Sequence, residues 1–534
     1  MLMQLCQAAT LIASTVFFLP ANVNVNASLL RGIDGDGKIE FGDTLKITED
    51  RSGTFLIKVI DYEDSSHDKT FNIMVDDFIF EIDDDEELKS LKSGESVTIP
   101  KGVTLGTKTA KAEMNGAKIQ PSKEGKKSKK KMKNLFDRNL EGTTEDEEQQ
   151  YNVGICSHLY SPVIGNKSVV AVRVQTTDAV YSNSEAYLRS KVFGIGEGGD
   201  QFNLAVGYDQ CSFGQLTFSP LASHLGSGGV SIENGVVTIS VDESVGGHDD
   251  DECVNKLLVN AVTNKIKETF GDDMTSVADY WMFCLPPGVK CEGKAMGIAY
   301  AYINSYISVY NDMWCNSPSA QMHEIGHNLN FGHSGEGDEN LDKVYGDQSG
   351  MMGFSYFHDE GPVMCFNPAK SWQSGWYGPE GAYEDKTLKY SVFDSCLVTT
   401  LSGIADYNTT SNKVLVKIVN PVDLAGADIF VAFNAKKGIR KGTQEAGNLV
   451  TVVQVASGGG LLYSNSKLLA KISSGSGASY TNSDFGGESL TVEVVSINGS
   501  DSADVKIYFG SSCTVNPAPT SMPANWPRKY EQRR

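Results

Sequence analysis

The sequence is poor in positive charge. Lysine and arginine number 46 against 67 aspartates and glutamates, which leaves a formal net charge of −21 over 534 residues. Nucleic acids and anionic membranes are normally bound by a surplus of basic residues. We therefore expect no nucleic-acid partner.

Long apolar runs are also missing. An apolar run near the N-terminus, from Ala8 to Leu19, is too short to span a bilayer. It precedes Val25-Asn26-Ala27, which suits signal peptidase, so we predict a signal peptide over residues 1–27. Since no basic segment precedes the run, an N-terminal core helix is the alternative. No later segment is apolar enough to cross a membrane, and we expect a secreted protein without a transmembrane anchor.

Cysteine is absent between residues 28 and 155, and no CxxC spacing occurs anywhere. Nine of the ten cysteines remain once Cys6 leaves with the signal peptide. This pattern favours structural disulfides formed in an oxidising compartment over a thiolate metal site, and the odd count leaves one thiol over. Cys284 and Cys291, which flank LPPGVK, are the predicted pair. The same secretory route fits three glycosylation sequons, at Asn166, Asn408 and Asn498.

Residues 28–150 differ in composition from the rest of the chain. They carry an acidic block, EIDDDEE, from Glu81 and a lysine block, KKSKKKMK, from Lys126. A solvated lysine run is readily reached by a trypsin-like or furin-like protease, so we predict a propeptide followed by a processing loop. The alternative is a small N-terminal domain with a charged linker that is never cut. Calcium could bind among the many aspartates, but DGDGKIEFGD from Asp34 has Gly32 at the first ligand position and is interpreted as an acidic turn.

Residues 151–385 have the pattern of an α/β domain. The β-branched run KSVVAVRVQTTDA from Lys167 predicts a central strand. The segment VSIENGVVTISV from Val230 predicts a hairpin that turns at Asn234-Gly235. Strands therefore come first in this domain.

Helices and a further strand are predicted next. Apolar residues at helical spacing predict a helix from Val254 to Ile266 that ends before Gly271. The segment GIAYAYINSYISVY from Gly297 predicts another strand near a cleft, and Ser317-Pro318 predicts a helix start.

Residues 386–515 are almost entirely β in pattern. Short apolar runs separated by Gly, Ser and Asn predict a β-sandwich-like domain. These runs begin at Val414, Ile429, Leu449, Leu490 and Val505. Residues 516–534 are rich in proline and basic, and we expect a disordered tail.

The stretch QMHEIGHNLNFGHS from Gln321 reads HExxHxxNxxH. On a helix His323 and His327 leave the same face and can bind one metal ion. Glu324 can accept a proton from metal-activated water and deliver it to the leaving amine, as a general base. His333 can reach the same ion only if the helix breaks. Asn330 suits that break, because asparagine tolerates positive φ better than other non-glycine residues.

The segment YGDQSGMMGFSY from Tyr345 offers a tight turn with Met351 and Met352, as expected beneath the metal in a zinc peptidase of the metzincin type. Tyr356 is the nearest candidate to stabilise an oxyanion. Asp347 could orient a liganding histidine, although capping of the turn is the preferred interpretation. Three imidazoles could also hold copper or another transition metal.

These motifs together resemble the gametolysin-like peptidases, family M11 of the metzincins. The resemblance is carried by MHEIGHNLNFGH, YGDQSGMMG, CSFGQLTFSP and VVAVRV, and covers residues 150–385. It implies a metzincin-like α/β (α+β) catalytic domain with a twisted mixed sheet and an active-site helix. It also implies secreted endopeptidase activity on extracellular or cell-wall glycoproteins. The implied site is one Zn²⁺ bound by His323, His327 and His333, with Glu324 as base and Met352 as the Met-turn residue.

Two features depart from the metzincin pattern. Asn330 stands where metzincins have glycine, and no cysteine before Cys156 is available for a cysteine switch within the propeptide. We expect latency by bulk or by a propeptide carboxylate instead. Two other functions stay open: a secreted binding protein with a structural zinc, which the intact Glu324 opposes, and a metal hydrolase acting on bonds other than peptides.

Overall fold

The computed structural model describes most of the chain from residue 162 to 513, together with short N-terminal strands. The signal peptide, the turn at Asp34, the lysine block and the tail over 516–534 lie outside the described residues. The gaps after residue 162 are 197–198, 251, 338–342, 354–358, 379–385, 392–395, 421–426, 456–463 and 476. The N-terminal described residues are 44–46, 51–61, 67–75, 78–83, 91, 93, 95–99, 103–106, 112–113 and 119–121.

The central part of the chain is built on a mixed sheet with the order β10-β9-β14-β18-β17. Strands β10, β9, β14 and β18 run parallel, whereas β17 is antiparallel to β18. Strand β13 also pairs in parallel with β9, beside β10. The bounds are β9 Gly165–Gln175, β10 Leu216–Pro220, β13 Val236–Ser240, β14 Tyr280–Leu285, β17 Ala299–Tyr302 and β18 Ile307–Asn311.

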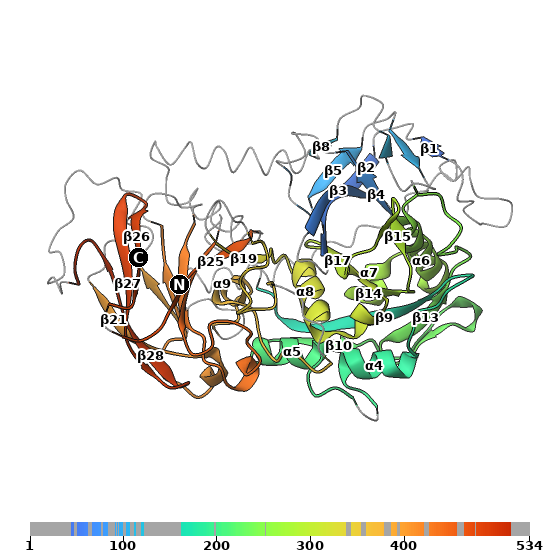
Figure 1. The fold of residues 1–534 in the computed structure, drawn as a ribbon. Helices are drawn as coiled ribbons and strands as arrows, with labels where there is room; N and C mark the ends of the chain where they lie inside the picture. The colour runs from blue at the N-terminus through green and yellow to red at the C-terminus, as the bar shows by residue number, and fades with distance from the viewer. Residues whose placement is uncertain are drawn as a thin grey trace, which may run out of the picture.

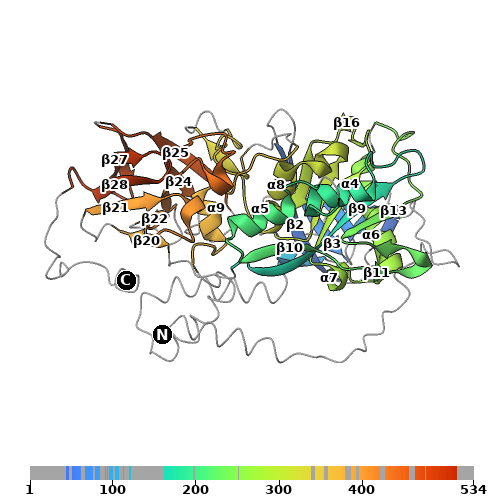
Figure 2. The ribbon, with the colours of Figure 1, turned by 90° about the horizontal axis from the view of Figure 1, so that it is seen from below.

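Helices cover both faces of this sheet. Val169 and Ala171 of β9 pack in one core with α4, α5 and α8, whereas Val170 and Val172 pack in another with α6. This alternation follows from the two-residue period of a strand. Figures 1 and 2 show α8 and α6 in separate layers. The helices are α4 Glu185–Phe193, α5 Leu204–Cys211, α6 Val254–Phe270, α7 Met274–Val277, α8 Pro318–Asn328 and α9 Pro368–Gln373.

Most of the predicted elements in this part are confirmed. Strand β9 is interior, α6 ends at Gly271, and α8 begins at Pro318 after Ser317. The segment from Gly297 is a correction: it forms two strands, β17 and β18, because the chain turns at Asn304, where φ is 51°.

The predicted hairpin at Asn234-Gly235 is only half right. Both residues have positive φ and form the turn. The flanking strands separate after one bridge between Glu233 and Val236, since β13 joins β9 and its neighbour β12 joins β11. The small strands are β11 His224–Leu225, β12 Ser231–Ile232, β15 Lys290–Cys291 and β16 Lys294–Ala295.

The N-terminal strands extend the central sheet. Strand β2 pairs antiparallel with β17, and β3, β4 and β5 follow it (Figure 1, blue). The pairing joins residues on either side of the predicted boundary at 150. The bounds are β1 Thr44–Lys46, β2 Arg51–Asp61, β3 His67–Val75, β4 Phe78–Ile82, β5 Ser96–Ile99, β6 Thr104–Gly106, β7 Ala112–Glu113 and β8 Gln120–Pro121.

The C-terminal part contains two sheets that share one core. One has the order β19-β25-β24-β23-β22-β20 and the other β21-β28-β27-β26. The five β runs predicted in this region are confirmed as β22, β23, β24, β27 and β28. The bounds are β19 Ser334–Glu336, β20 Thr387–Tyr390, β21 Leu397–Ser402, β22 Leu415–Ile418, β23 Ile429–Phe433, β24 Val450–Val455, β25 Ser466–Ile472, β26 Ser479–Phe485, β27 Glu488–Asn498 and β28 Ser502–Phe509.

Four disulfides link the described cysteines, and they correct the predicted pair. Cys284 bonds to Cys315 and Cys291 bonds to Cys253, so the two cysteines that flank LPPGVK are not joined. Cys284 lies on β14 beside β18, the strand that leads to Cys315. Cys291 lies on β15 next to the start of α6, where Cys253 is the N-cap. The remaining bridges are Cys211–Cys365 and Cys396–Cys513, whereas Cys156 lies outside the described residues. Among the described helices, none combines the length and apolar character needed to cross a bilayer.

Candidate metal centre

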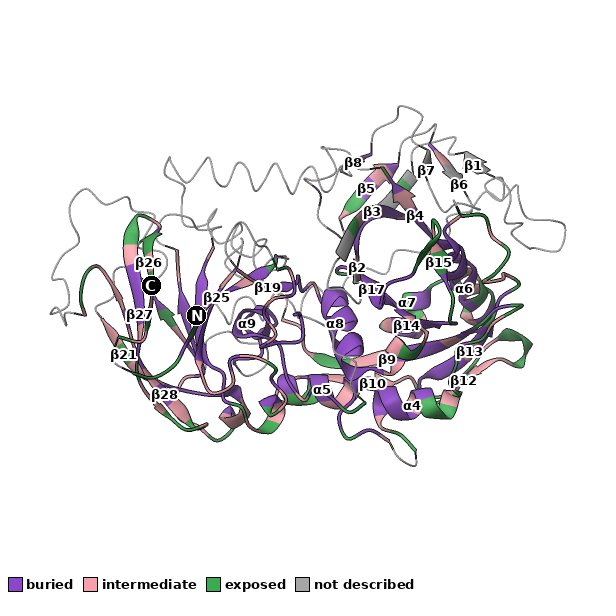
Figure 3. Ribbon diagram, viewed as in Figure 1, coloured by how far each residue is buried: buried purple, intermediate pink, exposed green. Residues whose placement is uncertain are grey.

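Helix α8 carries the histidine motif and is buried along its whole length (Figure 3). Its C-terminal end is tied to the β17–β18 hairpin, because the side-chain amide of Asn328 donates to the backbone oxygens of Tyr302 at 2.9 Å and Ile307 at 3.0 Å. Near its middle, the Tyr208 hydroxyl of α5 donates to the backbone oxygen of Met322 at 2.8 Å. The helix is therefore a rigid support for the side chains that it presents.

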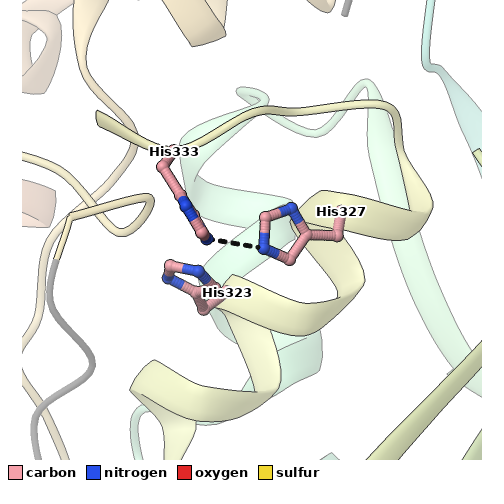
Figure 4. A group of neighbouring side chains, drawn as sticks. All are labelled: His323, His327 and His333. Carbon is pink, nitrogen blue, oxygen red and sulfur yellow. Dashed lines mark hydrogen bonds between the residues drawn. The ribbon is translucent and has the colours of Figure 1, made fainter. Parts of the chain in front are cut away.

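The three histidines of the motif converge. His323 and His327 project from α8, and His333 approaches them from the following loop (Figure 4). One ring nitrogen from each lies within 4.8 Å of the others, and the group could hold a metal ion. All three side chains are buried, with His333 the most exposed at 3 %.

The loop returns His333 to the helix as the sequence predicted. Asn330 has a φ of 73°. Its N–H donates to the backbone oxygen of His327 at 2.9 Å, and the N–H of Phe331 reaches back to Gly326 at 2.9 Å. The prediction that asparagine takes the left-handed conformation in place of glycine is confirmed.

Backbone carbonyls select the ring nitrogens that face the centre. Nδ1 of His323 lies 2.8 Å from the Met351 oxygen, and Nδ1 of His327 lies 2.8 Å from the Phe331 oxygen. A carbonyl can only accept, so each Nδ1 carries a proton, and in the neutral ring Nε2 then has the lone pair that binds a metal. Nε2 of His327 lies 3.1 Å from Nε2 of His333.

These nitrogens fit a zinc ion. Two nitrogens bound to one tetrahedral zinc at about 2.0–2.1 Å are roughly 3.3 Å apart, close to the separation of the His327 and His333 nitrogens. Among the described residues, the group that could hold a metal ion consists of these three imidazoles.

The turn at Met351 and Met352 packs against the same helix. The N–H of Ser334 donates to the Met352 oxygen at 2.7 Å. A Cβ placed on Gly326 would lie 2.6 Å from the Met352 sulfur, so a larger residue there would require the Met352 side chain to move. Met352, the predicted Met-turn residue, is fully buried in this turn.

Asp347 caps this turn. Its carboxylate accepts from the Ser349 N–H at 3.1 Å, the Ser349 hydroxyl at 2.5 Å and the Asn367 amide at 2.9 Å. Burial raises the pKa of Asp347, and these hydrogen bonds oppose the rise. The two helix histidines bond to backbone carbonyls and not directly to Asp347. Tyr356 lies outside the described residues.

Sequence reasoning missed three residues around this centre. The Tyr345 ring lies 4.3 Å from the His333 ring and 6.1 Å from the His323 ring, between ring centroids. Arg440, from the C-terminal part, donates to the backbone oxygens of Phe366 at 2.8 Å and of Ser349. The position of Tyr345 at the start of YGDQSGMMG was a usable signal, whereas Arg440 has none in the local pattern.

The third missed residue is Lys370 of α9, which is fully buried. Its ammonium donates to the backbone oxygen of Ser464 at 2.5 Å. Burial lowers the pKa of Lys370 to about 7, and the nearby Asp347 charge opposes that fall.

Comparison with known proteins adds one result. The family model described as gametolysin peptidase M11 matches residues 179–448, just over half of the chain. The matched range contains α8, the three histidines and the methionine turn. Neither the curated proteins nor the solved structures yield a match.

Proposed function

The chain belongs to the gametolysin peptidase M11 family, and from this premise we propose that it is a secreted zinc endopeptidase acting on extracellular or cell-wall glycoproteins. The family makes it a metallopeptidase with protein substrates. The proposal of a zinc site rests on the convergence of three buried imidazoles. In two of them Nδ1 donates to a backbone oxygen.

His323, His327 and His333 would hold the zinc ion. When bound, zinc polarises the scissile carbonyl and lowers the pKa of water toward neutrality. Glu324, the residue after His323 on α8, would take the proton from the attacking water and deliver it to the leaving amine. Its complete burial favours this role, since a low-dielectric surrounding strengthens each charge interaction.

The turn and its neighbours would support the site rather than react. Met352 would hold α8 from below through its contact with Gly326. Asp347 would keep the turn closed through Ser349 and Asn367. Tyr356 stays a proposal as a donor to the developing oxyanion.

Residues 28–150 would act as a propeptide. The N–H of Ile303, next to β17, donates to the backbone oxygen of Ile57 at 3.0 Å, and β2 pairs with β17 along four residues. Extended peptides bind proteins by adding a strand to an exposed sheet edge. The paired β2 would keep such a peptide from β17 until these residues are removed.

Secretion is supported by the disulfides. Four bridges among the described cysteines suit an oxidising compartment. Asn166, Asn408 and Asn498 are all exposed, as glycosylation would require. The β-rich C-terminal part would form a sandwich-like domain, and no observation on the described residues supports calcium.

The test is cleavage of a quenched protein substrate by the processed enzyme, with bound metal measured in the same samples. Wild type should contain one zinc and cleave, and a chelator should abolish cleavage. Glu324→Gln, which keeps the size of the side chain, should retain zinc and lose about 10²–10⁴-fold in rate. A panel of extracellular glycoproteins then tests the substrate class. Full cleavage by Glu324→Gln, or by the metal-free enzyme, would overturn the proposal.

A further inference from the structure

The third histidine is bonded to the C-terminal sheet through its backbone. The N–H of His333 donates to Oδ1 of Asn465 at 3.0 Å, and the N–H of Ser466 donates to the His333 oxygen at 2.9 Å. Both peptide groups that flank His333 are thus held by two adjacent residues, the first of which lies 132 positions further along the chain. His323 and His327 need no such contacts, because α8 itself fixes them.

Strand pairing continues the same contact. Ser334 opens β19 and is in parallel register with Ser466 at the start of β25. The metal-binding loop therefore becomes the edge strand of the C-terminal sheet immediately after its last histidine. Figure 1 shows β19 and β25 together, between α8 and the remaining C-terminal strands.

A glycine allows the two segments to approach so closely. A Cβ on Gly332 would lie 2.5 Å from the Ser464 oxygen and 2.7 Å from Asn465 Oδ1. Real Cβ atoms do not approach other atoms this closely, so a side chain here would push residues 464–465 away. Glycine at position 332 therefore permits this close contact.

Helix α9 and its N-cap residue Asn367 hold the same segment. Lys370 donates to the Ser464 oxygen at 2.5 Å. The Asn367 amide donates to the hydroxyls of Ser334 at 3.0 Å and Ser466 at 2.9 Å. The segment 464–466 is therefore held in place by contacts other than those with His333.

We propose that Asn465 and Ser466 are positioning residues for the third metal ligand, and that the C-terminal sheet completes the metal centre. The inference rests on the proposed zinc site. A hydrogen bond on each side of His333 sets the position of its Cα, and the reach of its ring follows from that position. Both residues lie beyond residue 448, where the family match ends. The C-terminal part is then a component of the catalyst, in addition to anything it binds.

The test compares three variants of the full, processed chain. Asn465→Ala removes the acceptor for the His333 N–H, and Asn465→Asp restores one. Asn482→Ala is the matched control, because Asn482 Oδ1 accepts a backbone N–H from Asp484 at 3.0 Å within the C-terminal part, on β26. Asn465 is exposed, so its truncation leaves no cavity.

The readout is the zinc dissociation constant, measured by competition with a chelator. Asn465→Ala should bind zinc about tenfold more weakly, since partners that orient a metal ligand are typically worth 10–100-fold in affinity. The zinc dissociation constants of Asn465→Asp and Asn482→Ala should stay within about twofold of wild type. The carboxylate in Asn465→Asp supplies a new acceptor for the His333 N–H, and Asn482 Oδ1 accepts from Asp484 rather than from His333. The thermal midpoints of the three metal-free variants should be similar.

Two outcomes overturn the inference. One is wild-type zinc affinity in Asn465→Ala, and the other is a loss in Asn482→Ala as large as in Asn465→Ala. If wild type itself binds no zinc, the proposed function fails instead, so the two failures are distinguishable.

Discussion

Nδ1 of His323 donates to the backbone oxygen of Met351 across 2.8 Å. The next residue, Met352, places its sulfur against Gly326 on the same helix. The turn therefore orients the His323 ring through one residue and supports the helix that bears His323 through the next. Changes in the turn should affect metal binding and stability together.

Asn330 should be replaceable by glycine but not by alanine. Its φ of 73° lies in the left-handed region, where a Cβ costs roughly 1–2 kcal/mol unless the side chain is Asn or Asp. We expect Asn330→Gly to match wild type within about 0.5 kcal/mol and Asn330→Ala to be about 1 kcal/mol less stable. Urea unfolding of the metal-free protein measures both. Equal stability of the two variants would show that the loop does not depend on this conformation.

Gly326→Ala should destabilise the protein through Met352. The new Cβ would lie 2.6 Å from the sulfur, and overpacking of a core typically costs about 1–3 kcal/mol. Combining it with Met352→Ala should remove that cost, because the clashing atom is gone and alanine is favoured over glycine in helices by about 0.5–1 kcal/mol. A double-mutant cycle in urea measures the coupling, and additive effects would contradict the contact.

Stability should rise with pH above neutrality because of Lys370. Its pKa is about 7 in the folded protein and 10.5 ordinarily. Between these values the unfolded chain holds more protons than the folded one, so the free energy of unfolding increases with pH. Below about pH 7 Lys370 is charged in both states, and the folded protein is destabilised by the full free energy of burying that charge.

Replacement by an uncharged side chain isolates this effect. Lys370→Met should flatten the rise in unfolding free energy between about pH 7 and 10, a rise of several kcal/mol in wild type. Lys265→Met, at an exposed position on α6, should leave it unchanged. Urea titrations across this range provide the measurement, and parallel curves for wild type and Lys370→Met would refute the assignment.

Asn260 should help keep the unprocessed chain inactive. On α6 it accepts from the Ile79 N–H at 3.2 Å and donates to the Ile79 oxygen at 3.1 Å, which bonds β4 to the central part. Asn260→Ala removes both bonds and leaves a buried N–H and C=O without this partner, at roughly 1–3 kcal/mol. The N-terminal strands should dock more weakly.

The consequence is measured as basal cleavage of peptide substrate before processing. Asn260→Ala should raise it several-fold, whereas the processed enzyme should be unaffected. Asn264→Ala, whose amide donates to Glu268 at the exposed side of α6, is the control. If the unprocessed wild type is already as active as the processed enzyme, the propeptide proposal is wrong.

Local features of the fold could be predicted from the sequence because their causes are local. The spacing of His323 and His327, the helix start at Ser317-Pro318 and the left-handed Asn330 each depend on a few neighbouring residues. The β runs after residue 386 are also visible as short apolar segments. The two strands after Gly297 look like one in the sequence, because the apolar pattern continues on both sides of Asn304. The turn at Asn304 becomes evident only from its positive φ in the structure.

The sequence by itself determined the histidine motif proposed to bind metal and the helix that presents its first two histidines, through side-chain periodicity and backbone preference. Tertiary structure alone decided the partners of Cys284 and Cys291, the pairing of β2 with β17 and the contact of Asn465 with His333. These contacts join segments far apart in the chain, and a backbone hydrogen bond or a disulfide carries no residue pattern that names its partner. Packing brings such groups together, so they can be identified only once the sheets are assembled.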